Sequence, residues 1–190
     1  MSPTIYFSRE NTEKILLGLY LNVFRPAGVS DNAKLPVVVW IYGGGFSTGD
    51  ASLFNASALV SRSVQLGNPV VYVSFNYRVN GFGFLAGKEV KEAGVANLGI
   101  HDRKRTCLDD VLISSLSFTE RMALAWVQEF VEKFGGDPKK VTLWGQSAGS
   151  LSITTHLVTH PDRADTPFRG AIMVSCGSCP KEYQSLIMTP

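Results

Sequence analysis

Four short apolar segments stand out along the chain because they contain few polar positions. They are residues 37–42, 70–76, 141–144 and, more weakly, 171–175. Their β-branched residues favour strands, and apolar runs without alternation are typical of strands buried on both faces of a parallel sheet. We therefore predict a mostly parallel sheet with helices on both sides.

Two segments between these strands have apolar residues at helical spacing, residues 53–65 and 120–134. The second helix is predicted over residues 120–134, with Thr119 as a candidate N-cap and Gly135 and Gly136 ending it. Lys133 then lies near the negative end of its dipole. Strand, helix and strand in alternation predict an open, doubly wound α/β sheet with right-handed crossovers.

A serine motif follows the third predicted strand, in the order Gly145, Gln146, Ser147, Ala148, Gly149, and an apolar helical segment, 151–158, comes next. In so tight a turn from strand to helix the serine is strained, and side chains at the two glycine positions would collide with their neighbours. The free N–H groups of the helix N-terminus would favour a developing anion. We interpret Ser147 as a nucleophile in a nucleophile elbow. The alternative is a chance match, which its place between strand and helix disfavours.

Three successive glycines, Gly43, Gly44 and Gly45, follow the first predicted strand. They let the backbone approach a ligand closely and turn N–H groups toward it. In acyl transfer, each donor aimed at the developing oxyanion is worth about 3 kcal/mol. We assign an oxyanion hole to the backbone N–H groups of Gly44, Gly45 and Ala148. The alternatives are a flexible turn and a phosphate-binding loop, and the absence of a Gly-Lys-Ser/Thr or G-x-G-x-x-G pattern disfavours the second.

With both motifs in place, the sequence from about Leu19 to Ser178 resembles the type-B carboxylesterase/lipase family, which includes fungal secreted lipases and cholinesterases. The matching segments are 21–26 (LNVFRP), 36–46 (PVVVWIYGGGF), 76–78 (NYR), 83–85 (GFL), 97–99 (NLG), Asp102, 134–138 (FGGDP), 144–149 (WGQSAG) and 168–173 (FRGAIM). The resemblance implies one partial α/β-hydrolase domain over residues 1–190. It also implies hydrolysis of a small-molecule or lipid carboxylic ester through an acyl-enzyme on Ser147, without cofactor or metal.

The chain departs from this family in three places. Residues 1–18 are not expected to be homologous, and 15–20 stand where the family carries a disulfide cysteine, so that disulfide is not expected. Residues 103–120 are interpreted as an insertion from a retained intron or a misplaced exon boundary. The chain ends at Pro190, and the resemblance implies that the acidic and histidine members of the catalytic triad lie beyond it.

A nucleophilic serine needs a base, and the histidines are His101, His156 and His160. His156 and His160 follow Ser147 by nine and thirteen residues, which a helix converts into about 14 Å or more. In the family resembled, the position of His101 has no catalytic role. We therefore assign no base and no acid. We interpret the remaining nearby carboxylates as turn, cap or solvated residues: Asp102, Asp109, Asp110, Asp162 and Asp165.

Composition limits the partners. A net charge of +2 with scattered Lys and Arg argues against nucleic acid, and no apolar run approaches the roughly 20 residues that cross a bilayer. The N-terminus lacks the pattern of a signal peptide, although the family resembled is mostly secreted, so localisation stays unassigned. Cys176 and Cys179 form a lone CxxC without a nearby histidine, which favours loop thiols over a metal or redox site.

The aromatic residues near the motifs have different expected places. Trp40 and Trp144 fall within strands and are expected in the core, whereas Phe46 directly follows the glycines and is the better candidate for an acyl pocket. Residues 76–78 are expected in a buried structural network rather than on substrate. The leading hypothesis is thus a serine esterase. The alternatives are a non-catalytic truncated homologue, an adhesion-type binding member of the same family, which the intact Ser147 disfavours, and a gene fragment without an independent fold.

Overall fold

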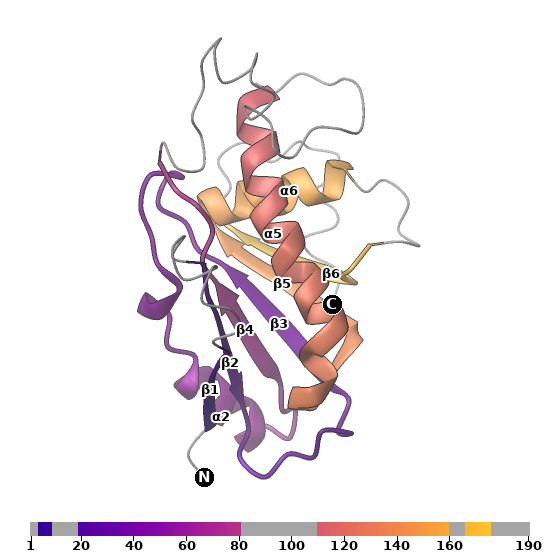
Figure 1. Ribbon diagram of the computed structural model, residues 1–190. Helices are drawn as coiled ribbons and strands as arrows, with labels where there is room; N and C mark the ends of the chain where they lie inside the picture. The colour runs from indigo at the N-terminus through magenta and orange to yellow at the C-terminus, as the bar shows by residue number, and fades with distance from the viewer. Residues whose placement is uncertain (1–3, 9–18, 81–109, 160–165, 176–190) are drawn as a thin grey trace.

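A computed structural model of the chain describes residues 4–8, 19–80, 110–159 and 166–175 (Figure 1). Within these residues, six strands form one sheet in the order β1-β2-β4-β3-β5-β6. The strands are β1 (Thr4–Ser8), β2 (Leu21–Arg25), β3 (Leu35–Ile41), β4 (Val71–Phe75), β5 (Gly136–Gln146) and β6 (Gly170–Val174). The helices are η1 (Ala51–Leu53), α2 (Ser57–Gln65), α5 (Asp110–Phe130), η2 (Val131–Phe134) and α6 (Ala148–Thr159). The predicted α/β class is confirmed.

The four apolar segments form the parallel part of the sheet, as predicted. β3 pairs in parallel with β4 and β5, and β5 pairs in parallel with β6. Val39 and Trp40 in β3 are both buried. Because successive side chains of a strand point to opposite faces, their burial means that both faces of β3 are covered.

The N-terminal side of the sheet is antiparallel, which the apolar pattern did not predict. β1 pairs antiparallel with β2, and β2 pairs antiparallel with β4. β2 is only five residues long, and Asn22 and Arg25 interrupt its apolar character. Its Asn22 is nevertheless buried, with its amide 3.5 Å from the Ser74 hydroxyl. The sheet is therefore mixed, with the parallel strands at the side that carries the serine motif.

Helix α5 begins ten residues before the predicted start at Glu120, at Asp110. Thr119 therefore lies inside the helix and is not its N-cap, so that prediction was wrong. Once a helix is nucleated, each further residue adds a hydrogen bond, and a single threonine does not stop it. At the other end, α5 stops at Phe130, and the 3-10 helix η2 continues the helical segment to the predicted end at Gly135, which has the left-handed φ of +81°.

The helices cover the two faces of the sheet in separate groups. α5 and α6 lie together over one face (Figure 1). On the other face, the Phe54 ring packs 5.2 Å from that of Trp40. The helix predicted at 53–65 is two elements, because the Asn55 side chain accepts a hydrogen bond from the Ser57 N–H and α2 begins there. In the described ranges, no helix combines the length and apolar character needed to cross a bilayer.

Candidate active site

Ser147 lies in the turn between β5, which ends at Gln146, and α6, which begins at Ala148. Its φ is +54°, in the left-handed region that residues with a side chain rarely adopt. The Ser147 N–H donates to the Val174 carbonyl of β6 at 2.9 Å, and the Ser147 carbonyl accepts from the Ser150 N–H at 2.9 Å. Hydrogen bonds on both sides therefore hold a conformation that costs about 1–3 kcal/mol.

The two glycines of the motif are required by close backbone contacts. A Cβ atom on Gly145 would lie 2.5 Å from the Gly149 carbonyl oxygen, and one on Gly149 would lie 2.0 Å from the Ile41 carbonyl oxygen. Backbone atoms cannot rotate away from such contacts as a side chain can. The collision expected for side chains at these positions is thus found in the structure.

The three glycines form a second turn directly after β3. Gly44 has a φ of +114°, and Gly45 and Phe46 have φ values of +61° and +60°. The Gly44 carbonyl accepts from the N–H groups of Ser47 and Thr48 at 3.1 and 3.2 Å, which closes the turn. In the part of the chain that the structure describes, neither the Gly44 nor the Gly45 N–H donates a backbone hydrogen bond.

The glycine turn and the serine turn lie against each other because β3 and β5 are neighbours in the sheet. Ile41 at the end of β3 is opposite Gly145 of β5. A Cβ atom on Gly43 would lie 3.1 Å from the Ser147 Cβ. The N–H of Ala148 belongs to the first turn of α6, where backbone donors have no partner within the helix. The structure thus brings together the two turns that hold Ser147, Gly44, Gly45 and Ala148, while the catalytic roles of these residues stay predictions.

His156 lies on α6 and does not face this junction as a free base. Its Nε2 is 2.7 Å from the Glu120 carboxylate of α5, and both side chains are only 1% exposed. Glu120 had been assigned to the insertion, and nothing in its local sequence indicates a partner in another helix. His101, His160, Cys176 and Cys179 lie outside the described residues, as do Asp102, Asp109, Asp162 and Asp165.

The aromatic and polar residues around the turns are buried to different degrees. Trp40 is in the core as expected, whereas Trp144, whose ring lies 5.1 Å from that of Trp40, is only partly buried. Phe46 is half-buried beside the glycine turn, and its place in an acyl pocket stays a prediction. Asn76 accepts a hydrogen bond from the Ala51 N–H at 2.7 Å, and Tyr77 is buried. Among the described residues, no group of three or more His, Cys, Asp or Glu side chains could hold a metal ion.

A serine between a parallel strand and a helix, on a mostly parallel sheet flanked by helices, defines the α/β-hydrolase class. Residues 18–108 and 117–185 match the Carboxylesterase family. The chain belongs to this family. The residues left unmatched between the two segments, 109–116, lie within the segment predicted as an insertion, 103–120.

Known relatives are lipases and esterases. The chain is 41% identical over 168 residues to Secreted triacylglycerol lipase LIP1 of Gibberella zeae, covering 86% of this chain and 26% of that protein. It is 43% identical over 161 residues to Lipase 2 of Diutina rugosa, covering 83% and 26%.

Two solved structures have the same fold. The Aspergillus niger EstA structure matches with a TM-score of 0.62 at 33% identity, over 81% of this chain and 26% of that one. A structure titled thermophylic pNB esterase matches with a TM-score of 0.61 at 34% identity, over 86% and 29%. The chain thus spans about a quarter of the length of the relatives it matches.

Proposed function

We propose that the protein to which this chain belongs hydrolyses carboxylic esters, with Ser147 as the nucleophile. One observation carries the proposal: Ser147 is held at a φ of +54° between strand and helix, and its Cβ lies 3.1 Å from the position of a Cβ on Gly43. A serine hydroxyl raised out of a sheet beside free backbone N–H groups is suited to acyl transfer. Membership of the Carboxylesterase family supports the same reaction.

The chemistry proposed for the site has two stages. The Ser147 hydroxyl oxygen attacks the ester carbonyl carbon while its proton passes to a base, and the carbonyl oxygen becomes an oxyanion bound by the N–H groups of Gly44, Gly45 and Ala148. The tetrahedral intermediate collapses, and the alcohol leaves with that proton. Water then attacks the acyl-enzyme in the same way and releases the acid.

The base is proposed to come from sequence that the longer relatives have and this chain does not share. Among the described residues the histidine is His156, which is buried against Glu120. The substrate is proposed to be a small-molecule or lipid carboxylic ester, as the relatives' names indicate for those proteins. No acyl or alcohol chain length is assigned.

The second candidate is that the 190-residue chain by itself is a non-catalytic homologue. The engagement of His156 by Glu120 favours it, because a serine without a base retains only weak activity from the oxyanion hole and binding.

Labelling of the purified chain with a fluorophosphonate probe, beside a Ser147→Ala control, tests whether the chain by itself contains the base that activates Ser147. If the site is assembled, the probe should label the chain rapidly and should not label the Ser147→Ala control. A folded chain that stays unlabelled while a full-length relative labels would leave Ser147 without its base and support the non-catalytic candidate.

A further inference from the structure

Two tyrosines next to the glycine turn hold each other through reciprocal hydrogen bonds. The Tyr77 hydroxyl donates to the Tyr42 carbonyl oxygen at 2.8 Å. The Tyr42 hydroxyl donates to the Tyr77 carbonyl oxygen at 3.1 Å and accepts from the Tyr77 N–H at 3.3 Å. The rings are stacked, with centroids 4.3 Å apart and planes inclined by 17°. Each side chain therefore fixes the backbone of the other residue.

Both tyrosines are buried, so these bonds form away from water. Burial raises the pKa of Tyr42 to about 12, and burial raises the pKa of Tyr77 as well. Both hydroxyls consequently keep their protons, and the Tyr77 hydroxyl remains a donor over the pH range in which proteins are usually studied. In a poorly solvated interior, such a bond is stronger than one exposed to water.

The Tyr42 carbonyl lies at the junction of the two turns of the candidate site. A Cβ atom on Gly149 would lie 2.9 Å from this oxygen, and one on Gly43, the next residue, would lie 3.1 Å from the Ser147 Cβ. The peptide unit is planar, so a bond to the Tyr42 carbonyl also fixes the plane of the Gly43 N–H. The Tyr77 hydroxyl thus sets the direction in which the glycine turn leaves β3.

The segment that follows β4 also holds the far side of the same loop. The Asn80 N–H donates to the Phe46 carbonyl at 2.8 Å, and the Ala51 N–H donates to the Asn76 side chain at 2.7 Å. A Cβ atom on Gly49 would lie 2.5 Å from the Tyr42 ring, so the returning loop packs directly on that ring. Residues 76–80 therefore support the glycine turn from beginning to end.

We propose that Tyr77 is a positioning residue for the oxyanion donors, acting through its hydroxyl bond to the Tyr42 carbonyl. The inference rests on the proposed function, because the orientation of the glycine turn relative to Ser147 matters only if its N–H groups bind an oxyanion. On this proposal, the Tyr77 hydroxyl group orients the glycine turn, and the bulk of the Tyr77 ring does not.

Tyr77→Phe removes this hydroxyl and keeps the ring, so it is the direct test. The matched control is Tyr72→Phe in β4, the strand that precedes Tyr77, where a buried ring packs edge-on against Phe24 at 5.8 Å. The first measurement is amide hydrogen exchange of Ser47 and Thr48, whose N–H groups donate to the Gly44 carbonyl. Loss of one buried hydrogen bond is expected to speed their exchange by about five- to tenfold. Tyr72→Phe should leave it unchanged, and unchanged exchange in Tyr77→Phe would overturn the proposal.

Tyr42→Phe separates positioning from a general loss of packing. It removes the other hydroxyl but leaves the Tyr42 carbonyl bound, so exchange at Ser47 and Thr48 should change less than in Tyr77→Phe. Equal effects would show that the pair acts only as a structural unit and would overturn the proposal. All variants are compared after correction for their urea unfolding midpoints.

The rate of fluorophosphonate labelling at Ser147 supplies the functional readout. Tyr77→Phe should lower it by about tenfold, since a misaimed oxyanion donor costs one to three orders of magnitude, whereas Tyr72→Phe should not. Altered exchange with an unaltered labelling rate would refute the positioning role. A wild-type chain that folds but does not label would show that Ser147 lacks its base in this chain, and the exchange measurement alone would then decide whether Tyr77 orients the turn.

Discussion

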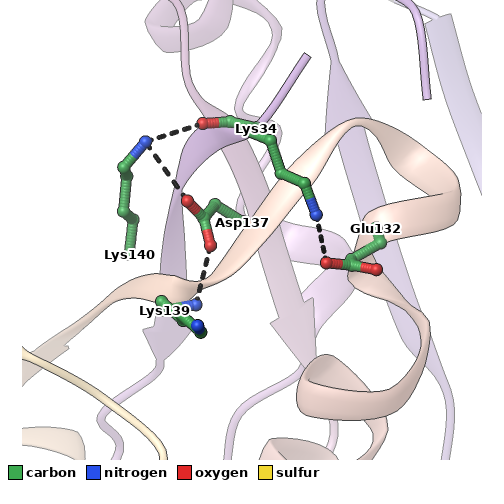
Figure 2. A network of polar contacts seen from close by, with 5 residues as sticks. All are labelled: Lys34, Glu132, Asp137, Lys139 and Lys140. Atoms are coloured by element: carbon green, nitrogen blue, oxygen red, sulfur yellow. Dashed lines mark hydrogen bonds and ion pairs between the residues drawn. The ribbon is translucent and has the colours of Figure 1, made fainter. Parts of the chain in front are cut away.

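Two residues beside the neighbouring strands β3 and β5 have the same left-handed φ of +54°: Lys34, just before β3, and Ser147, just after β5. Their surroundings differ. Lys34 is exposed and lies in a network of charges: its ammonium pairs with Glu132, and its carbonyl accepts from the Lys140 ammonium at 3.2 Å (Figure 2). Ser147 lies among close backbone contacts and backbone hydrogen bonds. The same local strain is therefore supported by solvated charges at one end and by a dense interior at the other.

This difference indicates which contacts the fold depends on. Exposed ion pairs are worth about 0–1 kcal/mol and are screened by salt. Buried polar groups lose far more when a partner is removed, because the remaining group stays desolvated. The start of the strands should tolerate substitution, and the end that carries the candidate site should not.

The largest expected effect comes from comparing the removal of a buried glutamate with the removal of an exposed one. Glu120→Ala leaves the buried His156 without its carboxylate, and breaking a buried pair costs about 3–5 kcal/mol of unfolding free energy. Glu132→Ala removes a carboxylate whose side chain is 52% exposed, so about 1 kcal/mol or less is expected. Urea unfolding of the two variants measures the difference, and equal losses would remove the contrast between buried and exposed contacts.

An intermediate effect is expected from adding one methyl group to the serine turn. Gly149→Ala places a Cβ atom 2.0 Å from the Ile41 carbonyl oxygen, and such overpacking costs about 3 kcal/mol. Gly67→Ala is the matched control, because Gly67 has a φ of +73° but no atom within 4 Å of its added Cβ. Its cost should be about 1–2 kcal/mol, from the left-handed backbone alone. If thermal unfolding gave both variants the same loss, close contact would not be what requires Gly149.

The smallest effect is expected at Asp137, in the charged network. Partial burial acts to raise its pKa, but hydrogen bonds from the Lys139 N–H and from Lys140 outweigh this and hold the pKa below the usual value of 3.8 (Figure 2). A lowered folded-state pKa stabilises the protein above pH 3.8, and this stability is lost as the pH falls through the folded value.

Asp137→Asn should therefore lower the unfolding free energy at pH 7 by about 0.5 kcal/mol. The difference from the wild type should vanish in acid, and it should shrink at 1 M salt because the charges are screened. Urea unfolding across a pH series measures it. A difference that stayed constant into acid would mean that the Asp137 carboxylate contributes nothing as a charge.

The same contrast explains how much could be predicted from the sequence. The parallel strands and the glycine positions of the serine turn were predictable, because burial on two faces and tight turns leave local patterns. The N-terminal boundary of α5 was not, since Thr119 is a cap signal that the helix passes through. β2 was missed because Asn22 and Arg25 interrupt its apolar pattern, although the strand is paired on both sides, with β1 and β4.

The contacts between distant residues left no local signal. The proximity of Gly43 and Ser147 follows from the order of strands, which places β3 beside β5, and the motifs alone do not give that order. The Tyr42–Tyr77 bonds and the Glu120–His156 contact join residues 35 and 36 positions apart. In each of these pairs, neither residue is unusual in its own segment.

The hydrogen bond from the Ser147 N–H to the Val174 carbonyl also sets an order of events during synthesis. Chains are made from the N-terminus and can begin to fold as they emerge. The strand, the serine and the first turns of α6 are all added to the growing chain before residue 174. The strained turn therefore obtains its tie to β6 only after that later strand has emerged and paired with β5. The geometry of the serine is a late product of folding, although its motif is complete 25 residues earlier at Gly149.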